Sequence, residues 1–399
     1  MTNVAILGFG VVGGGVADLI TKNRAEVTKL AENEINIKYI LDLRDFPDSP
    51  FADRVVHDYN VILNDASVST VIEVMGGSHP AYEFTVAALS AKKNVITSNK
   101  EVVANFGDEF LKLAKENGVS YRFEAAVGGG IPVIAPMIYC INQNKVSEVR
   151  GILNGTTNYI LTKMFSFGDS FDSALLDAQK RGYAERNPDA DILGTDAARK
   201  IAILAALATG KLVPVENVHT EGITKIRKND VIAAEKIGCK IKLLGRCINE
   251  DGTPYIMVAP FMLGADSALS GVAGVYNAIE VVAEPLGNVM FYGKGAGAGA
   301  TASAVVGDLM QTVKIGNSGA PKFEKSNGVK DFTTFKSRHF LAFDCGAKDT
   351  VKSVFANDVF IDNGECAFVT DVLTEKEVAE KISQVAAAGY SLLSDIRML

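Results

Sequence analysis

The sequence lacks the features that mark several large protein classes. Its 399 residues contain no apolar run near the roughly 20 residues that cross a bilayer, and no basic, cleavable leader stands at the start. The net charge is −7 and the basic residues are scattered, so there is no electrostatic footprint for nucleic acid or for an anionic membrane. These absences predict a cytoplasmic protein that binds neither partner.

Cysteine and histidine are also scarce. The five cysteines never stand in Cys-x-x-Cys spacing, and the four histidines form no His-Glu-x-x-His pattern. The sequence therefore predicts reduced, mostly buried cysteines, and it gives no support to a zinc site, a disulfide framework or a histidine triad. A hydrophobic content of 48% over this length predicts a globular chain of two or three domains.

The most informative feature lies near the start of the chain, where a G-x-G-x-x-G loop stands between an apolar stretch and a helix-like segment. Gly8 would permit the tight turn, Gly10 the close approach of a pyrophosphate, and Gly13 the packing of helix on strand. The exposed N–H groups of a helix N-terminus would favour phosphates. A tight turn without a ligand is the alternative. The residues expected to bind a dinucleotide are Phe9, Gly10, Val11, Val12 and Gly13.

Apolar runs alternate with helical patterns through the first third of the chain. Strand-like segments are expected at 35–41, 71–74, 95–97 and 121–127, which is the rhythm of a doubly wound parallel sheet. The rhythm stops at the glycine cluster 128–130. We predict an α/β fold with a Rossmann-type nucleotide-binding domain at 1–133, completed by a helix within 295–316.

The remaining chain has a different pattern. Helices are expected at 156–167 and 195–209, and closely spaced strands at 241–249, 255–262 and 275–282 indicate a mixed sheet. We assign residues 134–294 to a domain for substrate binding, catalysis and dimerisation. After a polar linker, residues 331–399 are expected to form a small α+β module.

Three groups of polar residues could carry chemistry in the nucleotide domain. Asp42 follows the second strand and could bind the adenosine ribose, while Arg44 could pair with a 2′-phosphate, so NAD and NADP both stay open. Lys100 follows the strand at 95–97, although a solvated surface charge is the more ordinary reading. Glu124 and nearby carbonyl groups could hold a monovalent cation, or the segment could be a glycine-rich hinge.

The densest polar constellation lies between Gly182 and Lys200. Asp196 and Lys200 are four residues apart on a helix whose other positions are apolar, so the pair could lie against a core and move a proton. Spacing alone favours an ordinary surface pair instead.

Longer motifs, taken together, carry a resemblance. The chain resembles the homoserine dehydrogenase family from its first residues to about Val313. The motifs are Gly8-Phe9-Gly10, Glu73-x-Met75-Gly76-Gly77, Thr97-Ser98-Asn99-Lys100, Asn154-Gly155-Thr156-Thr157-Asn158, and Gly182-Tyr183-Ala184-Glu185 with Asp191, Asp196 and Lys200. The residues from about 365 onward resemble a reduced ACT domain, without a Pro-Gly-Val-Leu-like effector loop near 344–350.

The resemblance implies reversible, NAD- or NADP-dependent reduction of L-aspartate 4-semialdehyde to L-homoserine, on the route to threonine and methionine. It implies that Lys200 moves the proton, that Asp196 orients Lys200, and that Lys100 contacts the reacting oxygen and the cofactor. Glu185 and Asp191 would bind the substrate, and Gly182 and Gly297 would approach the cofactor. A sodium ion would be held by Glu124, Val127, Gly129 and Ile131.

The resemblance also implies a homodimer or homotetramer, and a monofunctional chain, since no aspartokinase region precedes the glycine loop. Two other functions are alternatives. A non-catalytic nucleotide sensor with an effector module requires Lys100 and Lys200 to be inert. An aspartate-semialdehyde dehydrogenase needs a thiolate nucleophile, and no cysteine here stands in a cation-rich setting with a partner histidine.

Overall fold

The computed structural model describes residues 1–250, 252–362 and 364–399. The chain divides into two compact units. Unit 1 holds Met1–Val149, Ala202–Val215 and Val281–Asn327, and unit 2 holds Arg150–Ile201, Glu216–Glu280 and Gly328–Leu399. The domain boundaries expected from the sequence stay a prediction. Residues 251 and 363, which fall inside two of those expected domains, lie outside the described part.

A parallel sheet of six strands forms the centre of unit 1, and its strand order β3-β2-β1-β4-β5-β6 is that of a Rossmann fold. The Rossmann-type α/β prediction is therefore confirmed. Four residues of β1 are fully buried because helices cover both faces of such a sheet. The strands are β1 (Thr2–Leu7), β2 (Ile35–Leu41), β3 (Val55–Val56), β4 (Val68–Glu73), β5 (Asn94–Thr97) and β6 (Tyr121–Arg122).

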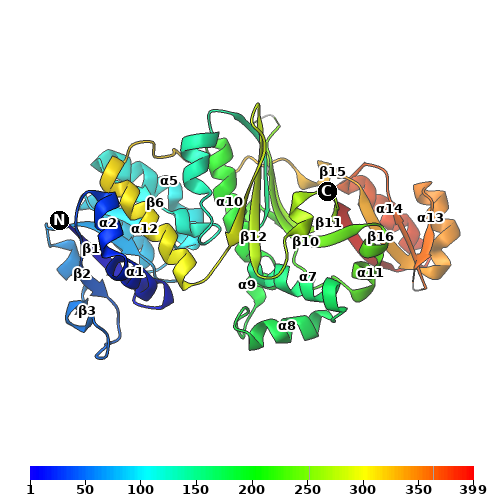
Figure 1. Cartoon of the computed structure of the whole chain (residues 1–399). Helices are drawn as coiled ribbons and strands as arrows, with labels where there is room; N and C mark the ends of the chain where they lie inside the picture. The colour runs from blue at the N-terminus through cyan, green and yellow to red at the C-terminus, as the bar shows by residue number, and fades with distance from the viewer. Residues whose placement is uncertain (251, 363) are drawn as a thin grey trace. The chain divides into compact units, whose positions relative to one another are not determined.

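Helices that are distant in sequence complete this unit. Figure 1 shows α12 beside α1, and the two pack so closely that a Cβ on Gly15 would lie 3.1 Å from the carbonyl oxygen of Ala298. α12 therefore packs on the nucleotide-binding sheet's first helix, while the expected domain boundaries that include residues 295–316 stay a prediction. The helices are α1 (Val11–Lys22), α2 (Arg24–Ala31), α3 (Tyr59–Leu63), α4 (Ala81–Ser90), α5 (Lys100–Asn117), α6 (Ile134–Pro136) and α12 (Ala298–Ile315).

The strand expected over 121–127 is wrong beyond Arg122. Residues Glu124–Ala126 form a 3-10 turn, and the backbone N–H of Glu124 donates to the Asp308 carboxylate (2.8 Å) instead of to a strand. Gly128 and Gly129 then take φ values of +74° and +58°, which an extended strand does not have. Because β6 is an edge strand, no neighbour beyond it holds the backbone extended.

Unit 2 is built on an antiparallel pair, β10 (Cys239–Ile248) and β11 (Tyr255–Gly264), which are in register over ten residues each. The short β9 (His219–Thr220) lies parallel to β11. Strands β7 (Lys145–Ile152) and β12 (Tyr276–Glu284) and helix α10 (Thr195–Thr209) run from one unit into the other. The helices wholly within unit 2 before the module are α7 (Gly155–Phe167), α8 (Phe171–Lys180), α9 (Asp189–Ile192) and α11 (Lys228–Lys236).

The C-terminal module has the expected α+β character. Its sheet has the order β20-β16-β18-β17, and β20 also pairs in parallel with β11. The module is therefore continuous with the central sheet of unit 2. Its main elements, orange to red in Figure 1, are β16 (His339–Asp344), α13 (Lys348–Phe355), β17 (Phe360–Asp362), β18 (Glu365–Val369), α14 (Glu375–Ala387) and β20 (Leu392–Met398).

The described residues also form five short or edge strands: β8 (Lys211–Leu212), β13 (Gly287–Lys294), β14 (Glu324–Lys325), β15 (Lys336–Ser337) and β19 (Leu373–Thr374). Among the described residues, none of the helices has both the length and the apolar character required to cross a membrane.

Candidate active site

The glycine loop has the geometry that its sequence predicts. β1 ends at Leu7, and α1 begins at Val11 with Gly10 as its N-cap and no side chain bonded to the first turn. Gly13 faces the turn so closely that a Cβ there would lie 2.0 Å from the carbonyl oxygen of Gly8. Around Gly10, by contrast, there is open space. The helix N-terminus is therefore exposed for an anion.

A hollow of about 640 Å³ opens over this loop. Gly10, Val11 and Val12 line it from the loop, and Asp42 and Arg44 line it from the end of β2. Its size and its position beyond the carboxyl ends of parallel strands suit a dinucleotide.

Asp42 is fixed to the glycine loop itself. The backbone N–H of Phe9 donates to its Oδ2 (2.8 Å), and Arg44 donates through Nε to Oδ1 and through Nη2 to Oδ2 (both 3.0 Å). These hydrogen bonds from Arg44 hold the pKa of Asp42 well below its usual range. Asp42 and Arg44, the two residues that could select the cofactor, thus form one ion pair, in which Arg44 is exposed and Asp42 is largely buried. Both NAD and NADP stay open.

Lys100 is the first residue of α5 and is half-buried. Asn99 caps the helix by accepting from the N–H of Glu101 (3.2 Å), and Asn99 is held by Thr97. Thr97 in turn donates to Glu73 (2.5 Å), and burial raises the pKa of Glu73 to about 7. A cation at a helix N-terminus opposes the helix dipole, so stability does not explain a lysine at this position.

In unit 2, Asp196 and Lys200 form a buried pair. Lys200 Nζ donates to Asp196 Oδ2 (2.6 Å) and to the carbonyl oxygen of Leu153 (2.8 Å), and the two residues are only 4% and 8% exposed. The interpretation as an exposed surface pair, which spacing alone favours, is therefore wrong. The signal for burial was the apolar composition of the rest of the helix.

Asn154 is a functional candidate that sequence reasoning named only as part of a motif. Its Oδ1 caps α7 by accepting from the N–H of Thr157 (2.9 Å), while its Nδ2 donates to Asp191 (2.7 Å) and to Asp196 (2.9 Å). Burial raises the pKa of Asp191, and the hydrogen bond from Asn154 opposes that rise. One amide therefore binds both carboxylates to the start of α7.

Glu185 and Gly182 are not drawn into this network. Glu185 is exposed between α8 and α9, and Gly182 has a φ of +72° with open space where a Cβ would be. Gly297, in unit 1, precedes α12 with a φ of +116° and is equally open. Their predicted contacts with substrate and cofactor stay predictions.

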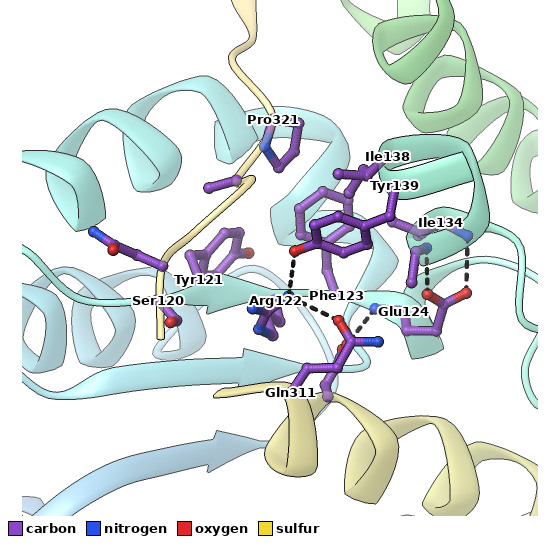
Figure 2. A pocket seen from close by; sticks show the side chains of 14 residues that line it. Ser120, Tyr121, Arg122, Phe123, Glu124, Ile134, Ile138, Tyr139, Gln311 and Pro321 are labelled. Atoms are coloured by element: carbon purple, nitrogen blue, oxygen red, sulfur yellow. Dashed lines mark hydrogen bonds between the residues drawn. The ribbon is translucent and has the colours of Figure 1, made fainter. Parts of the chain in front are cut away.

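The carboxylate of Glu124 is turned toward the backbone of Ile134, as Figure 2 shows. It accepts N–H groups from Val133 (2.7 Å), Ile134 (2.8 Å) and Ala135 (2.6 Å). Burial raises the pKa of Glu124, and these hydrogen bonds oppose that rise. Within the described ranges no group of three or more His, Cys, Asp and Glu residues is arranged to hold a metal ion.

Comparison with known proteins gives one consistent result. The family model "Homoserine dehydrogenase, NAD binding domain" matches residues 8–124, and the model "Homoserine dehydrogenase" matches residues 132–310. A homoserine dehydrogenase of Bacillus subtilis (strain 168) is 35% identical over 408 residues, covering 98% of this chain and 90% of that relative.

Solved structures agree with these matches. The crystal structure of a homoserine dehydrogenase from Thiobacillus denitrificans superposes with a TM-score of 0.93 at 30% identity, covering 100% of this chain and 98% of that one. A hyperthermophilic archaeal homoserine dehydrogenase mutant in complex with NADPH superposes with a TM-score of 0.68 at 29% identity, covering 79% and 99%.

The double role of Asn154 can be separated by two substitutions. Asn154→Ala removes the cap and both donors, and we expect it to cost about 1–3 kcal/mol and to lower the melting temperature at all pH values. Asn154→Asp keeps an acceptor for Thr157 but places a third carboxylate beside Asp191 and Asp196. Repulsion then raises carboxyl pKa values in the folded state, so this variant loses stability as pH rises.

Melting curves at about pH 5 and about pH 8 test this, since ordinary carboxyl pKa values lie below that window and raised ones enter it. The deficit of the Asp variant relative to wild type should be small at the lower pH and large at the higher pH. Equal deficits for both variants at both pH values would show that the contact of Asn154 with the two carboxylates does not set their pKa values.

Proposed function

The chain belongs to the homoserine dehydrogenase family, and from that premise we propose which residues carry its reaction. The enzyme is an NAD(P)-dependent oxidoreductase acting on a CH–OH group, which interconverts L-aspartate 4-semialdehyde and L-homoserine. Family membership favours this activity over a non-catalytic nucleotide sensor. The nicotinamide, when bound, supplies or accepts the hydride.

We propose that Lys200 moves the proton. When the aldehyde is reduced, its oxygen gains negative charge as the hydride arrives, and an ammonium group beside it stabilises that charge and protonates it. The observation that carries this role is the burial of the Lys200 ammonium between Asp196 and the Leu153 carbonyl oxygen. A buried, hydrogen-bonded cation is held ready before the reaction begins.

The other polar residues would bind and orient. Asp196 fixes Lys200, and Asp191, tied to it through Asn154, would bind the substrate together with the exposed carboxylate of Glu185. The amino group of the substrate is the natural partner for a carboxylate. Lys100, placed against the dipole of α5, would contact the reacting oxygen and the cofactor.

We also propose that the hollow over the glycine loop binds the nucleotide. Phe9, Gly10, Val11, Val12 and Gly13 would meet the pyrophosphate, and Gly182 and Gly297 would approach the cofactor from open positive-φ turns. Asp42 would bind ribose hydroxyl groups, and Arg44 would meet a 2′-phosphate. The structure of the archaeal relative in complex with NADPH supports acceptance of the phosphorylated form.

The segment 124–131 offers oxygen atoms that could bind a sodium ion. Across the described residues no hydrogen bond is made to the carbonyl oxygens of Val127, Gly129 or Ile131, so these three oxygens are available as ligands. Oxygen ligands suit hard cations. We propose that these four residues hold the ion and that it stabilises this turn.

Self-association and cytoplasmic location complete the proposal. Met290 and Tyr292 are 40% and 54% exposed on β13, and exposed apolar side chains of this size favour an interface between copies. A homodimer or homotetramer is therefore expected. A cytoplasmic setting agrees with a biosynthetic enzyme that uses NAD(P).

The role of Lys200 predicts a specific kinetic defect. Lys200→Met should lower kcat by about 10² to 10⁴, as expected for a lost general acid, while the Kd of the cofactor stays near that of wild type. The double variant Lys200→Met with Asp196→Asn avoids an unpaired buried carboxylate and should show the same defect with less loss of stability. Rates, cofactor titration and melting curves on one preparation provide the measurement.

Lys112→Ala is the matched control. Lys112 also stands four residues from a carboxylate, Glu116, but the side chains are 78% and 58% exposed. This variant should leave kcat unchanged. Near-wild-type kcat in Lys200→Met at saturating substrate would remove Lys200 from the mechanism.

The role of Arg44 predicts an effect on one cofactor only. Arg44→Ala should weaken NADP binding by about tenfold, the value of one charge-assisted contact, and leave NAD binding nearly unchanged. Fluorescence titration with NADPH and NADH measures both. Equal losses of affinity for the two cofactors, or no loss, would show that Arg44 does not bind the 2′-phosphate.

The sodium proposal predicts a saturable stabilisation. At constant ionic strength, replacing choline by sodium should raise the melting temperature until the site is filled, because an ion that binds only the folded state stabilises it by mass action. Glu124→Gln should abolish this rise, and the exposed Glu116→Gln should preserve it. A rise that is identical in Glu124→Gln and wild type would contradict the site.

A further inference from the structure

Arg397, in β20 of the C-terminal module, is held by two carboxylates at once. It donates to Glu221 through Nη1 to Oε2 (3.0 Å) and Nη2 to Oε1 (2.9 Å), and to Glu375 through Nε to Oε1 (2.7 Å) and Nη2 to Oε2 (2.8 Å). Arg397 is only 4% exposed. Because the planar guanidinium donates two hydrogen bonds to each carboxylate, its orientation is fixed. The ammonium group of a lysine cannot make this set of contacts.

One of the two carboxylates lies outside the module. Glu221 follows β9, and its backbone N–H donates to the carbonyl oxygen of Val258 in β11 (2.7 Å). Glu221 also accepts from His219 (2.6 Å). Burial acts to raise the pKa of Glu221, but the bonds and charges of His219 and Arg397 outweigh it and lower the pKa to about 2. Glu221 is therefore ionised at neutral pH, and its two hydrogen bonds from Arg397 anchor residues 219–223 to the module.

The segment 219–223 also packs against the end of α9. The N–H of Ile223 donates to the carbonyl oxygen of Ile192 (2.9 Å), and a Cβ on Gly222 would lie 2.0 Å from that oxygen. Gly194, with a φ of +87°, comes so close to Thr220 and Val258 that its Cβ would lie 3.2 Å from each side chain. The turn from α9 to α10 therefore rests on residues 219–223 and on β11.

This turn carries the proposed catalytic carboxylates. Asp191 directly precedes Ile192, and Asp196 is the second residue of α10, one turn before Lys200. A shift of the 219–223 segment therefore moves the end of α9 and the start of α10, and with them both ends of the bridge that Asn154 makes to Asp191 and Asp196.

We propose that Arg397 is a positioning residue for the dehydrogenase reaction. By clamping Glu221, it fixes residues 219–223 against the α9–α10 turn and so sets the positions of Asp191, Asp196 and Lys200. The module thereby has a role in turnover as well as in folding. The inference rests on the proposed roles of these three residues, since it concerns how they are held.

Position matters at this scale because reacting groups must lie within a few tenths of an ångström of their productive places. A displacement of about 1 Å caused by a distant substitution costs about a hundredfold in rate. The cofactor loop is a separate element in unit 1, so a defect in the α9–α10 turn should spare cofactor binding.

Three variants test the proposal. Glu221→Gln keeps the shape of the side chain and the Arg397–Glu375 pair, Arg397→Lys keeps the charge but not this set of contacts, and Arg397→Met removes both. We expect kcat/KM for homoserine to fall by about tenfold to a hundredfold in each, with Arg397→Lys failing to rescue and with cofactor Kd unchanged. Glu221→Gln is the smallest structural change of the three. It still tests the proposal if Arg397→Met folds poorly.

Arg227→Met is the matched control. Arg227 also joins two carboxylates, Asp230 (2.6 Å) and Glu365 of β18 (2.8 Å), and so also ties the module to the rest of unit 2. Arg227 is the N-cap of α11, and its side chain bonds to Asp230 and Glu365 rather than to Glu221. We expect Arg227→Met to lower the melting temperature but to leave kcat/KM for homoserine unchanged.

A double-variant cycle makes the test specific. The double variant Glu221→Gln with Arg397→Met should have a kcat/KM no lower than that of the less active single variant. The effects are not additive because both substitutions act through the same Arg397–Glu221 contact. The proposal is overturned if Arg397→Met and Glu221→Gln lose stability as Arg227→Met does while kcat/KM stays at the wild-type value. Failure of the proposed function is a different result, namely normal kcat in Lys200→Met.

Discussion

The buried ion pair of Asp196 and Lys200 sets the demands that the surrounding structure must meet. Removing two charges from water costs several kcal/mol per ion, and their attraction offsets this only where further hydrogen bonds complete the shell. Here Leu153 supplies a carbonyl oxygen and Asn154 an amide. The motif at 154–158 is therefore explained by two needs at once, the capping of α7 and the support of a desolvated carboxylate.

Much of the secondary structure of unit 1 could be predicted from the sequence because short-range interactions determine it. The order strand, glycine loop and helix depends on steric rules that act within a few residues, so the turn after Leu7 and the close contact at Gly13 could be predicted. The helix at 195–209 and the strand at 35–41 were predictable for the same reason, because an uninterrupted apolar periodicity decides them. The long motifs added the family, which local rules do not contain.

The remaining features depend on contacts that no local pattern records. Residues 121–127 look extended, but the carboxylate of Asp308, 184 residues away in sequence, takes the N–H of Glu124. The burial of Lys200 depends on the packing of α10 on β10, where Gly245 lies so close that a Cβ would be 2.7 Å from Leu153 and 3.1 Å from Ile201. The pairing of Arg397 with Glu221 spans 176 residues. Spacing alone therefore misread the Asp196–Lys200 pair, and it gave no sign of Arg397.

The pairing of β20 with β11 has a consequence for solubility. β9 satisfies the outer edge of β11 at Met257 and Val258, and β20 satisfies it at Phe261 and Met262, whose side chains are fully buried. A shortened chain without the module would present this apolar strand with open backbone groups, which is a template for a foreign strand and for aggregation. The module is thus also a cover for a sheet edge. A shortened form that remains monodisperse would need a new strand, or a charged or proline residue, at that edge.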